Sequence, residues 1–406
     1  MSSKRFQKAI LKALKHTPRL EAWPCQHFPE CGGCAMQDIA YADQLAAKQA
    51  ALSELWGELL PTDVRDQFMV VPAADPFNYR LRMDYVCSDD RFGLRVRKRF
   101  FAIVDLQECH LIPPPMFRML RDVYAVAREL GIPDYNVYHN TGFLRYLVAR
   151  RNVRDEWLLS FVTSERAHER ALAQTAQAAL DAGATSVWWL LNPRHADLSF
   201  GEPLTHWGHE FLPQYVLDRT LLMGPNTFFQ NNVQGFEHIL RYITPFVAGA
   251  ERMIDLYAGV GTIGLCLADH VGHVFAAELS DESVALAQRN ITLNQLDGRV
   301  EVVQADVTQV LHDERTRGNV LVVDPPRAGL GPDVCALLSE HGPARVVYIS
   351  CNAITQSVDY GMLQERYKVV AAQGFDLFPQ TYHCEQVIVL ERRESCGPFE
   401  QLSTTR

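Results

Sequence analysis

The chain has 406 residues, of which 48% are hydrophobic and 21% charged, a composition typical of globular proteins that excludes a fibrous or disordered chain. At roughly 150 residues per domain, this length allows about two to three domains. No apolar run approaches the roughly 18 to 20 residues that span a bilayer, and the N-terminus lacks the apolar block of a secretory signal, so we expect a cytoplasmic protein without membrane contact.

The formal net charge of -9 disfavours nucleic acid as a partner, because counterion release favours basic proteins. Positive residues nevertheless cluster in residues 4–19, 91–99 and 145–154. Each cluster could form a local phosphate-binding face on an acidic protein, and a solvated face without function is an equally good interpretation of each.

The first part of the chain combines a basic segment with a cysteine-rich region. Residues 1–24 form the basic segment, whose pattern allows an amphipathic helix, and residues 25–115 begin with a cysteine-rich turn. A helix is predicted at 40–60 and short strands at 68–112, before three prolines at 113–115 interrupt the pattern.

Residues 116–220 mix helical and strand patterns. Apolar spacing predicts helices at 116–130 and 166–183. Runs typical of strands lie at 143–152, 156–164 and 186–192. The sequence therefore predicts a central α+β module.

Residues 221–395 are predicted to form an α/β domain with a doubly wound, Rossmann-like sheet, followed by a tail at 396–406. Short apolar runs alternate with helical segments such as 281–295, which implies a parallel sheet covered on both faces. Ligands of such sheets bind beyond the carboxyl ends of the strands. The predicted strands are 253–258, 273–279, 300–306, 319–326, 345–351 and 386–392.

The turn after the first of these strands has the features of a cofactor site. In DLYAGVGTIGL, Gly259, Gly261 and Gly264 let backbone approach a ligand and expose N–H groups at a helix start. Glu278, at the end of the next strand, is placed to bind two ribose hydroxyls, and Asp306, one strand later, to bind the adenine amine. The glycines alone would also fit a dinucleotide or a plain turn, but the combination favours S-adenosylmethionine over a nicotinamide cofactor.

The ends of the next two strands predict the reaction centre. One strand ends in DPPR, from Asp324 to Arg327, and the following one in SCN, with Cys351. Methyltransferases acting on exocyclic amines tend to carry an aromatic residue at the position of Arg327, so amine methylation is disfavoured. A thiol suits a carbon acceptor instead, because C5 of uracil becomes nucleophilic only after a nucleophile adds to C6. Taken alone, Cys351 could equally be a small buried residue.

A base must then remove the C5 proton so that the thiolate can leave. Glu385, in TYHCEQVIVL where the last strand begins, is the candidate general base. Alone it would be interpreted as an exposed carboxylate at a strand end. Its occurrence together with Cys351 and DPPR favours catalysis.

The motifs GPNTFFQNN, DLYAGVG, DPPR, SCN and HCE resemble, in order and spacing, the RNA uracil-5 methyltransferases of the 23S ribosomal RNA and transfer RNA families. The resemblance covers residues 221–392 and implies that 221–395 is an S-adenosylmethionine-dependent methyltransferase domain. It also implies that the cofactor contacts are Gln230, Tyr257, Glu278 and Asp324, that the nucleophile is Cys351 and that the proton acceptor is Glu385.

Four cysteines in residues 25–115 suggest a metal centre, since a cytoplasmic chain would keep its thiols reduced. Cys25, Cys31 and Cys34 have the spacing C-x5-C-x2-C, and Cys109 could be a fourth ligand. Three clustered thiolates and a remote one fit an iron-sulfur cluster better than zinc, whose ligands usually come in two close pairs. The ribosomal RNA branch of the resembled family implies a [4Fe-4S] cluster here.

The sequence thus predicts a monomeric enzyme that methylates C5 of a uridine in 23S ribosomal RNA through a covalent adduct between Cys351 and C6. Many cluster-bearing relatives carry a small β-barrel before the cysteines, and residues 1–24 are too few for one, so RNA contact is expected from 116–220 and the basic clusters. The alternatives are a transfer RNA uridine C5 methyltransferase and a non-catalytic RNA-binding protein with the same fold.

Overall fold

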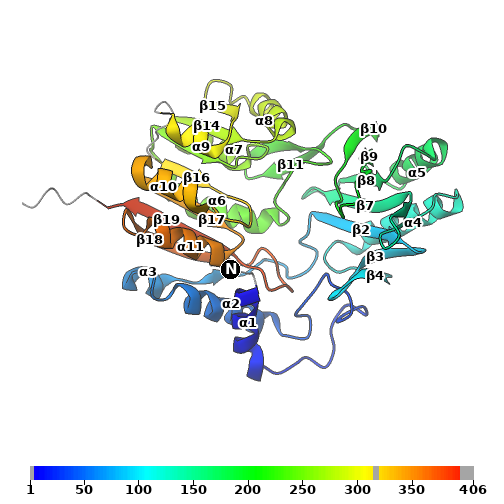
Figure 1. Ribbon diagram of the computed structural model, residues 1–406, viewed down its shortest axis with the longest axis horizontal. Coiled ribbons are helices and arrows are strands. Elements are labelled where there is room, and N and C mark those ends of the chain that lie inside the picture. Colours follow the sequence, from blue (N-terminus) through cyan, green and yellow to red (C-terminus); the bar gives the residue numbers. More distant parts are fainter. Residues whose placement is uncertain (1–3, 314–319, 394–406) are drawn as a thin grey trace, which may run out of the picture.

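Two β-sheets, each with its own helices, make up the protein (Figure 1). The computed structural model describes residues 4–313 and 320–393. The predicted tail at 396–406 lies outside the described residues. None of the helices in these two ranges combines the length and apolar character needed to cross a membrane.

The larger sheet has eight strands in the order β1-β18-β19-β17-β16-β13-β14-β15. Its pairs from β15 to β17 are parallel, whereas β19 runs antiparallel to both of its neighbours. The strands are β1 (Val70–Val71), β13 (Arg252–Leu256), β14 (His273–Glu278), β15 (Val300–Gln304), β16 (Val320–Val323), β17 (Arg345–Ser350), β18 (Tyr367–Phe375) and β19 (Glu385–Arg392).

Both faces of this sheet are buried because successive strand residues point to opposite sides. Met253 packs into a core with residues of α6, α7 and α8, whereas Ile254 packs into a second core with residues of α2, α3, α10 and α11. The helices are α2 (Tyr41–Trp56), α3 (Thr62–Gln67), α6 (Val233–Val247), α7 (Thr262–Leu267), α8 (Asp281–Leu293), α9 (Val307–His312), α10 (Gly331–His341) and α11 (Ala353–Leu363), with the short 3-10 helix η2 (Ala268–His270) after α7.

The smaller sheet has seven strands in the order β10-β9-β8-β7-β2-β3-β4, and α4 and α5 pack on it to form a third core. Two short hairpins, β5–β6 and β11–β12, accompany it. The elements are β2 (Arg82–Ser88), β3 (Arg91–Val96), β4 (Arg99–Asp105), α4 (Pro114–Glu129), β5 (Tyr135–Asn136), β6 (Thr141–Gly142), β7 (Leu144–Arg151), β8 (Trp157–Thr163), α5 (Glu169–Asp181), β9 (Ser186–Leu191), β10 (Glu202–Gly208), β11 (Leu212–Val216) and β12 (Arg219–Met223).

The predicted α/β class and parallel sheet are confirmed, and each predicted helix and strand corresponds to an observed one within a few residues. The differences come from long-range pairing. β18 was not predicted, and residues 82–105 join residues 144–208 in one sheet, across the boundary expected at 115. The prolines expected only to break the pattern instead begin α4, where their missing N–H groups cost nothing.

The N-terminal helices pack against the C-terminal sheet. The first helix, α1 (Lys4–Ala13), continues as the 3-10 helix η1 (Leu14–His16) and packs on α2. Lys48 of α2 forms a fully buried ion pair with Asp376, at 2.6 Å, and donates a 3.1 Å hydrogen bond to the carbonyl of Phe378. Removing one partner of such a pair leaves an uncompensated charge in the interior. The pair thus anchors the segment that leads into β19.

Candidate active site and cysteine pocket

The loop between β13 and α7 has the backbone shape of a ligand-binding turn. Tyr257, Gly259 and Gly261 have φ values of 63°, 56° and 86°, in the left-handed region that favours glycine. A Cβ placed on Gly259 would meet no atom within 4 Å, so open space lies beside the turn. Backbone N–H groups at the start of α7 can therefore approach a bound molecule.

Glu278 lies at the end of β14, directly beside this turn. Its Oε2 accepts a 3.0 Å hydrogen bond from the N–H of Gly259, and Oε1 accepts bonds of 2.8 and 2.9 Å from the N–H groups of Leu279 and Ser280. These contacts fix the orientation of the carboxylate at the position predicted for ribose recognition.

Asp306 follows β15 and is exposed. Its Oδ1 accepts a 2.9 Å hydrogen bond from the N–H of Thr308 and so caps α9, and these bonds from Thr308 lower the pKa of the carboxyl. Aspartate is a favoured residue at the start of a helix, so its capping role is a structural reason for an aspartate at this position. Binding of adenine by Asp306 stays a prediction.

Asp324 directly follows β16 and is held by Gln230. The Nε2 of Gln230 donates a 2.8 Å hydrogen bond to Oδ2 of Asp324. Burial raises the pKa of Asp324 to about 7, and the bond from Gln230 opposes this shift. Two residues 94 positions apart, both predicted as cofactor contacts, are thus in direct contact.

Cys351 lies between β17 and α11 and is half-buried. Burial and the nearby Glu385 carboxyl raise the pKa of its thiol to about 12, and the Arg327 guanidinium, which also hydrogen-bonds the thiol, opposes this shift. The thiol is therefore protonated at neutral pH in the free protein. It needs a positive neighbour or a base to become a nucleophile.

Glu385 is the first residue of β19 and only 5% exposed. Burial raises its pKa well above the ordinary value, the Asp324 carboxyl adds to this shift, and Arg327 opposes it. An ionised carboxylate in this environment is a stronger base than a glutamate in water. The structure brings together Cys351, Glu385 and Asp324 from the ends of three different strands.

Arg327 is the residue of this site that sequence reasoning missed. The sequence marked it only as the absence of an aromatic side chain, whereas the structure places its charge near both Cys351 and Glu385. Its position in DPPR, next to Asp324, was the available signal. A cation here favours the ionised forms of both reactive groups.

The four predicted cluster cysteines line one pocket beneath the β3 strand. The turn that carries Cys31 is tied to β3, because Cys31 forms a β-bridge with Val96 and the N–H of Gly32 donates a 2.9 Å bond to the carbonyl of Arg95. Burial, with a smaller contribution from the neighbouring thiols, raises the pKa of Cys31 and of Cys34 to about 12. Cys25, Cys31 and Cys109 are 7 to 8% exposed.

Among residues 4–313 and 320–393, no group of three or more His, Cys, Asp or Glu side chains is arranged to hold a metal ion. His27 is engaged elsewhere, since its Nε2 accepts a 2.8 Å hydrogen bond from the N–H of Gln107. His110 lies 3.4 Å from Glu108. His110 is also one of the residues that line the cysteine pocket.

The sequence pattern of the family described as tRNA (Uracil-5-)-methyltransferase matches residues 216–393. The chain is 31% identical over 381 residues to the tRNA (uracil(54)-C(5))-methyltransferase of Pyrococcus abyssi, with 93% of this chain and 88% of that protein covered. It is also 31% identical to an RNA methyltransferase of Nitratidesulfovibrio vulgaris described as uncharacterized, with 96% and 87% covered.

A solved structure is similar over the same extent. The crystal structure of Pyrococcus abyssi tRNA (uracil-54, C5)-methyltransferase in complex with S-adenosyl-L-homocysteine has a TM-score of 0.76, and covers 89% of this chain and 85% of its own at 31% identity. These similarities confirm the predicted methyltransferase and disfavour a non-catalytic protein. Since the similarity to the Pyrococcus abyssi protein covers about nine tenths of the chain at 31% identity, the chain belongs to the RNA (uracil-5-)-methyltransferase family.

Proposed function

We propose that the protein methylates C5 of a uridine in 23S ribosomal RNA through a covalent adduct between Cys351 and C6 of the base. The observation that carries this proposal is the meeting of the Cys351 thiol, the Glu385 carboxyl and the Asp324 carboxyl at the strand ends of one sheet. Nothing in the local sequence of any one of them requires this convergence.

The chemistry follows from the two reactive groups. The Cys351 thiol first gives its proton to water, and the Arg327 guanidinium stabilises the thiolate. The thiolate adds to C6, forming the S–C6 bond, and the electron pair of the C5–C6 double bond moves into an enolate, which makes C5 a nucleophile. After C5 is methylated, Glu385 takes the C5 proton. The electron pair of that C–H bond restores the double bond, and the S–C6 bond breaks to release the thiolate.

S-adenosylmethionine would supply the methyl group and bind where the strands of the larger sheet end. Open space at Gly259, the fixed carboxylate of Glu278 and the exposed Asp306 fit its ribose and adenine. Tyr257 adds an aromatic face beside the turn, and Gln230 with Asp324 forms the remaining polar wall. The donors and acceptors are therefore of the types that this cofactor requires.

We further propose that Cys25, Cys31, Cys34 and Cys109 hold a [4Fe-4S] cluster. Their convergence on one pocket with the apolar side chains of Leu94, Leu106 and Leu111 supports it. In a cubane cluster each thiolate binds a different iron, so the four sulfurs stand farther apart than the ligands of one ion. The lack of a side-chain group arranged around a single ion, within the part of the chain that the structure describes, is compatible with this arrangement.

Protein purified or reconstituted without oxygen is expected to contain about four irons per chain and to show the broad visible absorption of thiolate-bound iron. Cys109→Ser should lose most of the iron, because the fourth ligand comes from a distant loop that cannot be replaced locally. Cys87→Ser, in the interior of β2, is the matched control and should keep it. Stoichiometric zinc in the native protein would contradict the proposal.

The choice of ribosomal RNA rests on the cysteine pocket, since the resembled ribosomal branch carries a cluster on such cysteines. A specific observation favours transfer RNA as a second candidate, because relatives from Pyrococcus abyssi and Pyrococcus horikoshii, each 31% identical, are named tRNA (uracil(54)-C(5))-methyltransferases. In either case we propose that 221–395 is the catalytic domain, that 25–115 holds the cluster and that 116–220 contacts RNA.

The two substrates are separated by one measurement. Unmodified 23S ribosomal RNA and transfer RNA transcripts are incubated with the protein and labelled S-adenosylmethionine, and 5-methyluridine is mapped by mass spectrometry. We expect label at one uridine of the 23S transcript and none in transfer RNA. Label in transfer RNA alone would move the assignment to the second candidate.

A further inference from the structure

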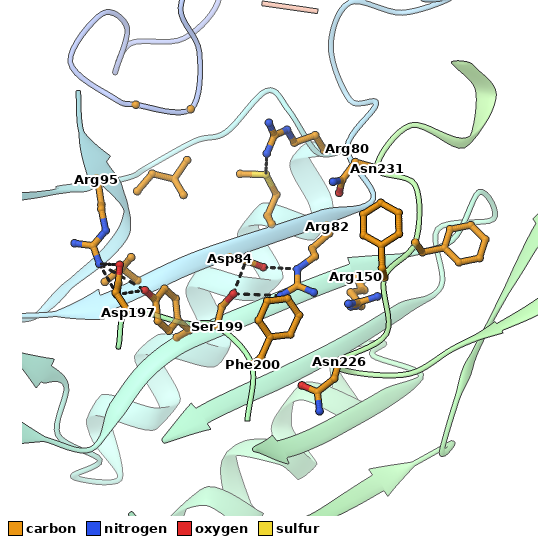
Figure 2. Close-up of a pocket in the computed structure, with 18 residues that line it drawn as sticks. Arg80, Arg82, Asp84, Arg95, Arg150, Asp197, Ser199, Phe200, Asn226 and Asn231 are labelled. Atoms are coloured by element: carbon orange, nitrogen blue, oxygen red, sulfur yellow. Dashed lines mark hydrogen bonds and ion pairs between the residues drawn. The ribbon is translucent and has the colours of Figure 1, made fainter. Parts of the chain in front are cut away.

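A second pocket, separate from the reaction centre, opens on the seven-stranded sheet (Figure 2). Its cavity volume is about 640 Å³, within the range of roughly 300 to 1,000 Å³ typical of small-molecule sites. Four parts of the protein form its walls: the strands β2, β3 and β7, the Gly32–Gly33 turn of the cysteine region, the loop 197–200 between β9 and β10, and the segment 226–231 that precedes α6.

Positive charge dominates the wall of this pocket. Four arginines line it, and two aspartates face them: Arg80, Arg82, Arg95, Arg150, Asp84 and Asp197. Both carboxylates are already paired, Asp84 with Arg82 at 2.7 Å and Asp197 with Arg95 at 2.7 Å. Glu282 interacts with Arg150 from outside the lining, and with it counted the positive charges still outnumber the negative ones.

Arg150 is the unusual member of this group. It is 2% exposed, and its Nε and Nη2 donate to no protein atom. Burial and the nearby Arg82 lower its pKa to about 9. Buried guanidinium N–H groups without acceptors cost free energy, which an anionic ligand would offset. In the sequence Arg150 belonged to a basic cluster that could have been a solvated surface, and the structure shows that it is not.

Aromatic rings stand beside these charges. Phe228 is 63% exposed and Phe200 is 43% exposed, although large apolar side chains are usually covered in a single chain. The guanidinium of Arg82 lies 4.3 Å from the centre of the Phe200 ring. Figure 2 shows Phe200 and Arg82 on the same side of the pocket, with Asn226 and Asn231 on the segment that carries Phe228. Aromatic faces next to cations are typical of sites for unstacked nucleotides.

We propose that this pocket binds a second nucleotide of the RNA substrate, close to the target uridine in the same strand, with its base against Phe228 and Phe200 and its phosphate on Arg150. The inference rests on the proposed RNA substrate and adds a specific recognition site to it. The pocket holds one nucleotide outside the fold of the RNA while the target uridine lies at Cys351.

The segment 226–231 contributes residues to both the pocket and the reaction centre, which supports placing the second nucleotide close to the target uridine. Phe228, Phe229 and Asn231 line the pocket, whereas Gln230 between them donates to Asp324 in the reaction centre. Consecutive Cα atoms are about 3.8 Å apart, so the pocket and the cofactor wall are separated by the width of a single extended segment. A strand of RNA that reaches one can reach the other.

The test measures RNA affinity in the full-length protein, with 23S ribosomal RNA and transfer RNA transcripts as probes in filter binding. Arg150→Met is expected to weaken binding of the transcript that serves as the methylation substrate roughly 10- to 100-fold, as for a hydrogen-bonded charged group. For the Arg150→Met variant, the plot of log affinity against log salt concentration should be less steep by about 0.7, the value for one phosphate contact on a single strand. Phe228→Ala, at an exposed site, should weaken binding about tenfold.

Arg170→Met is the matched control, since it removes one charge from the exposed side of α5 in the same half of the molecule (Figure 1). Because an exposed charge away from the pocket contributes little, this variant should change RNA affinity by less than about twofold. All three variants should bind S-adenosylhomocysteine as the unsubstituted protein does, which checks their folding. Unchanged RNA affinity in both pocket variants, or equal weakening by Arg170→Met, would overturn the inference.

Failure of the catalytic proposal gives a different result. If the unsubstituted protein binds RNA but transfers no methyl group to either transcript, the proposed function fails while the affinities still test the pocket. A loss of affinity in Arg150→Met without a change in the salt slope would overturn the phosphate assignment.

Discussion

Replacing Cys351 with alanine is expected to abolish methyl transfer to RNA, with a rate loss of at least about 10⁴-fold, as for other enzymes that lose their nucleophile. Alanine cannot add to C6, and without that addition C5 of uracil is too poor a nucleophile to accept a methyl group. The remaining side chains of the site, including Glu385 and Arg327, stay in place. The measurement is incorporation of labelled methyl groups into the RNA substrate.

RNA containing 5-fluorouridine makes the same prediction visible as a covalent product. Fluorine replaces the C5 proton, so after methylation there is no proton to remove and the S–C6 bond cannot break. The unsubstituted protein should give an RNA adduct that survives denaturation. Cys335→Ala, which removes another thiol buried within α10, should give the adduct as well. An adduct in Cys351→Ala would exclude Cys351 as the nucleophile.

Glu385→Gln is expected to stop the cycle after methylation. The amide has nearly the shape of the carboxyl but cannot accept the C5 proton, so the methylated adduct should accumulate on ordinary uridine RNA. Turnover should fall about 10²- to 10⁴-fold, the range for loss of a general base. The measurement is the amount of labelled methyl group that stays bound to protein after denaturation.

His383→Gln is the matched control for this result, because His383 lies two residues before Glu385 and is half-buried. Burial, with the charges of Arg327, Lys48 and Arg80, lowers its pKa to about 4, so it is uncharged at neutral pH. We expect no trapped adduct in this variant. If Glu385→Gln turns over normally, or if His383→Gln traps the adduct, the proton acceptor is not Glu385.

A substantial part of the catalytic half could be predicted from sequence, because the information there is local. Buried parallel strands are short apolar runs, and the residue that ends each run must lie at the carboxyl edge of the sheet. Glu278, Asp324 and Cys351 were placed at that edge from the sequence, and the structure has them there. The sequence placed Glu385 at the start of the last strand, which is where β19 begins.

Only the tertiary structure decided which distant groups meet. Strand order within a sheet is set by packing over the whole chain, so neither the insertion of β19 between β17 and β18 nor the pairing of β1 with β18 has a local signal. The convergence of the four cysteines with β3 is of the same kind.

The charges illustrate the same division. In the sequence, Arg150 is one residue of a basic cluster, and Arg327 is one residue of the DPPR motif. Their environment is set by the residues that surround them in space. These bury Arg150 with its Nε and Nη2 lacking acceptors, and place Arg327 beside a thiol and a carboxyl. The sequence by itself determined the class of fold and the types of reactive group, because both are encoded in short patterns. The structure alone determined their neighbours, because burial and electrostatic interaction depend on distances that no local pattern contains.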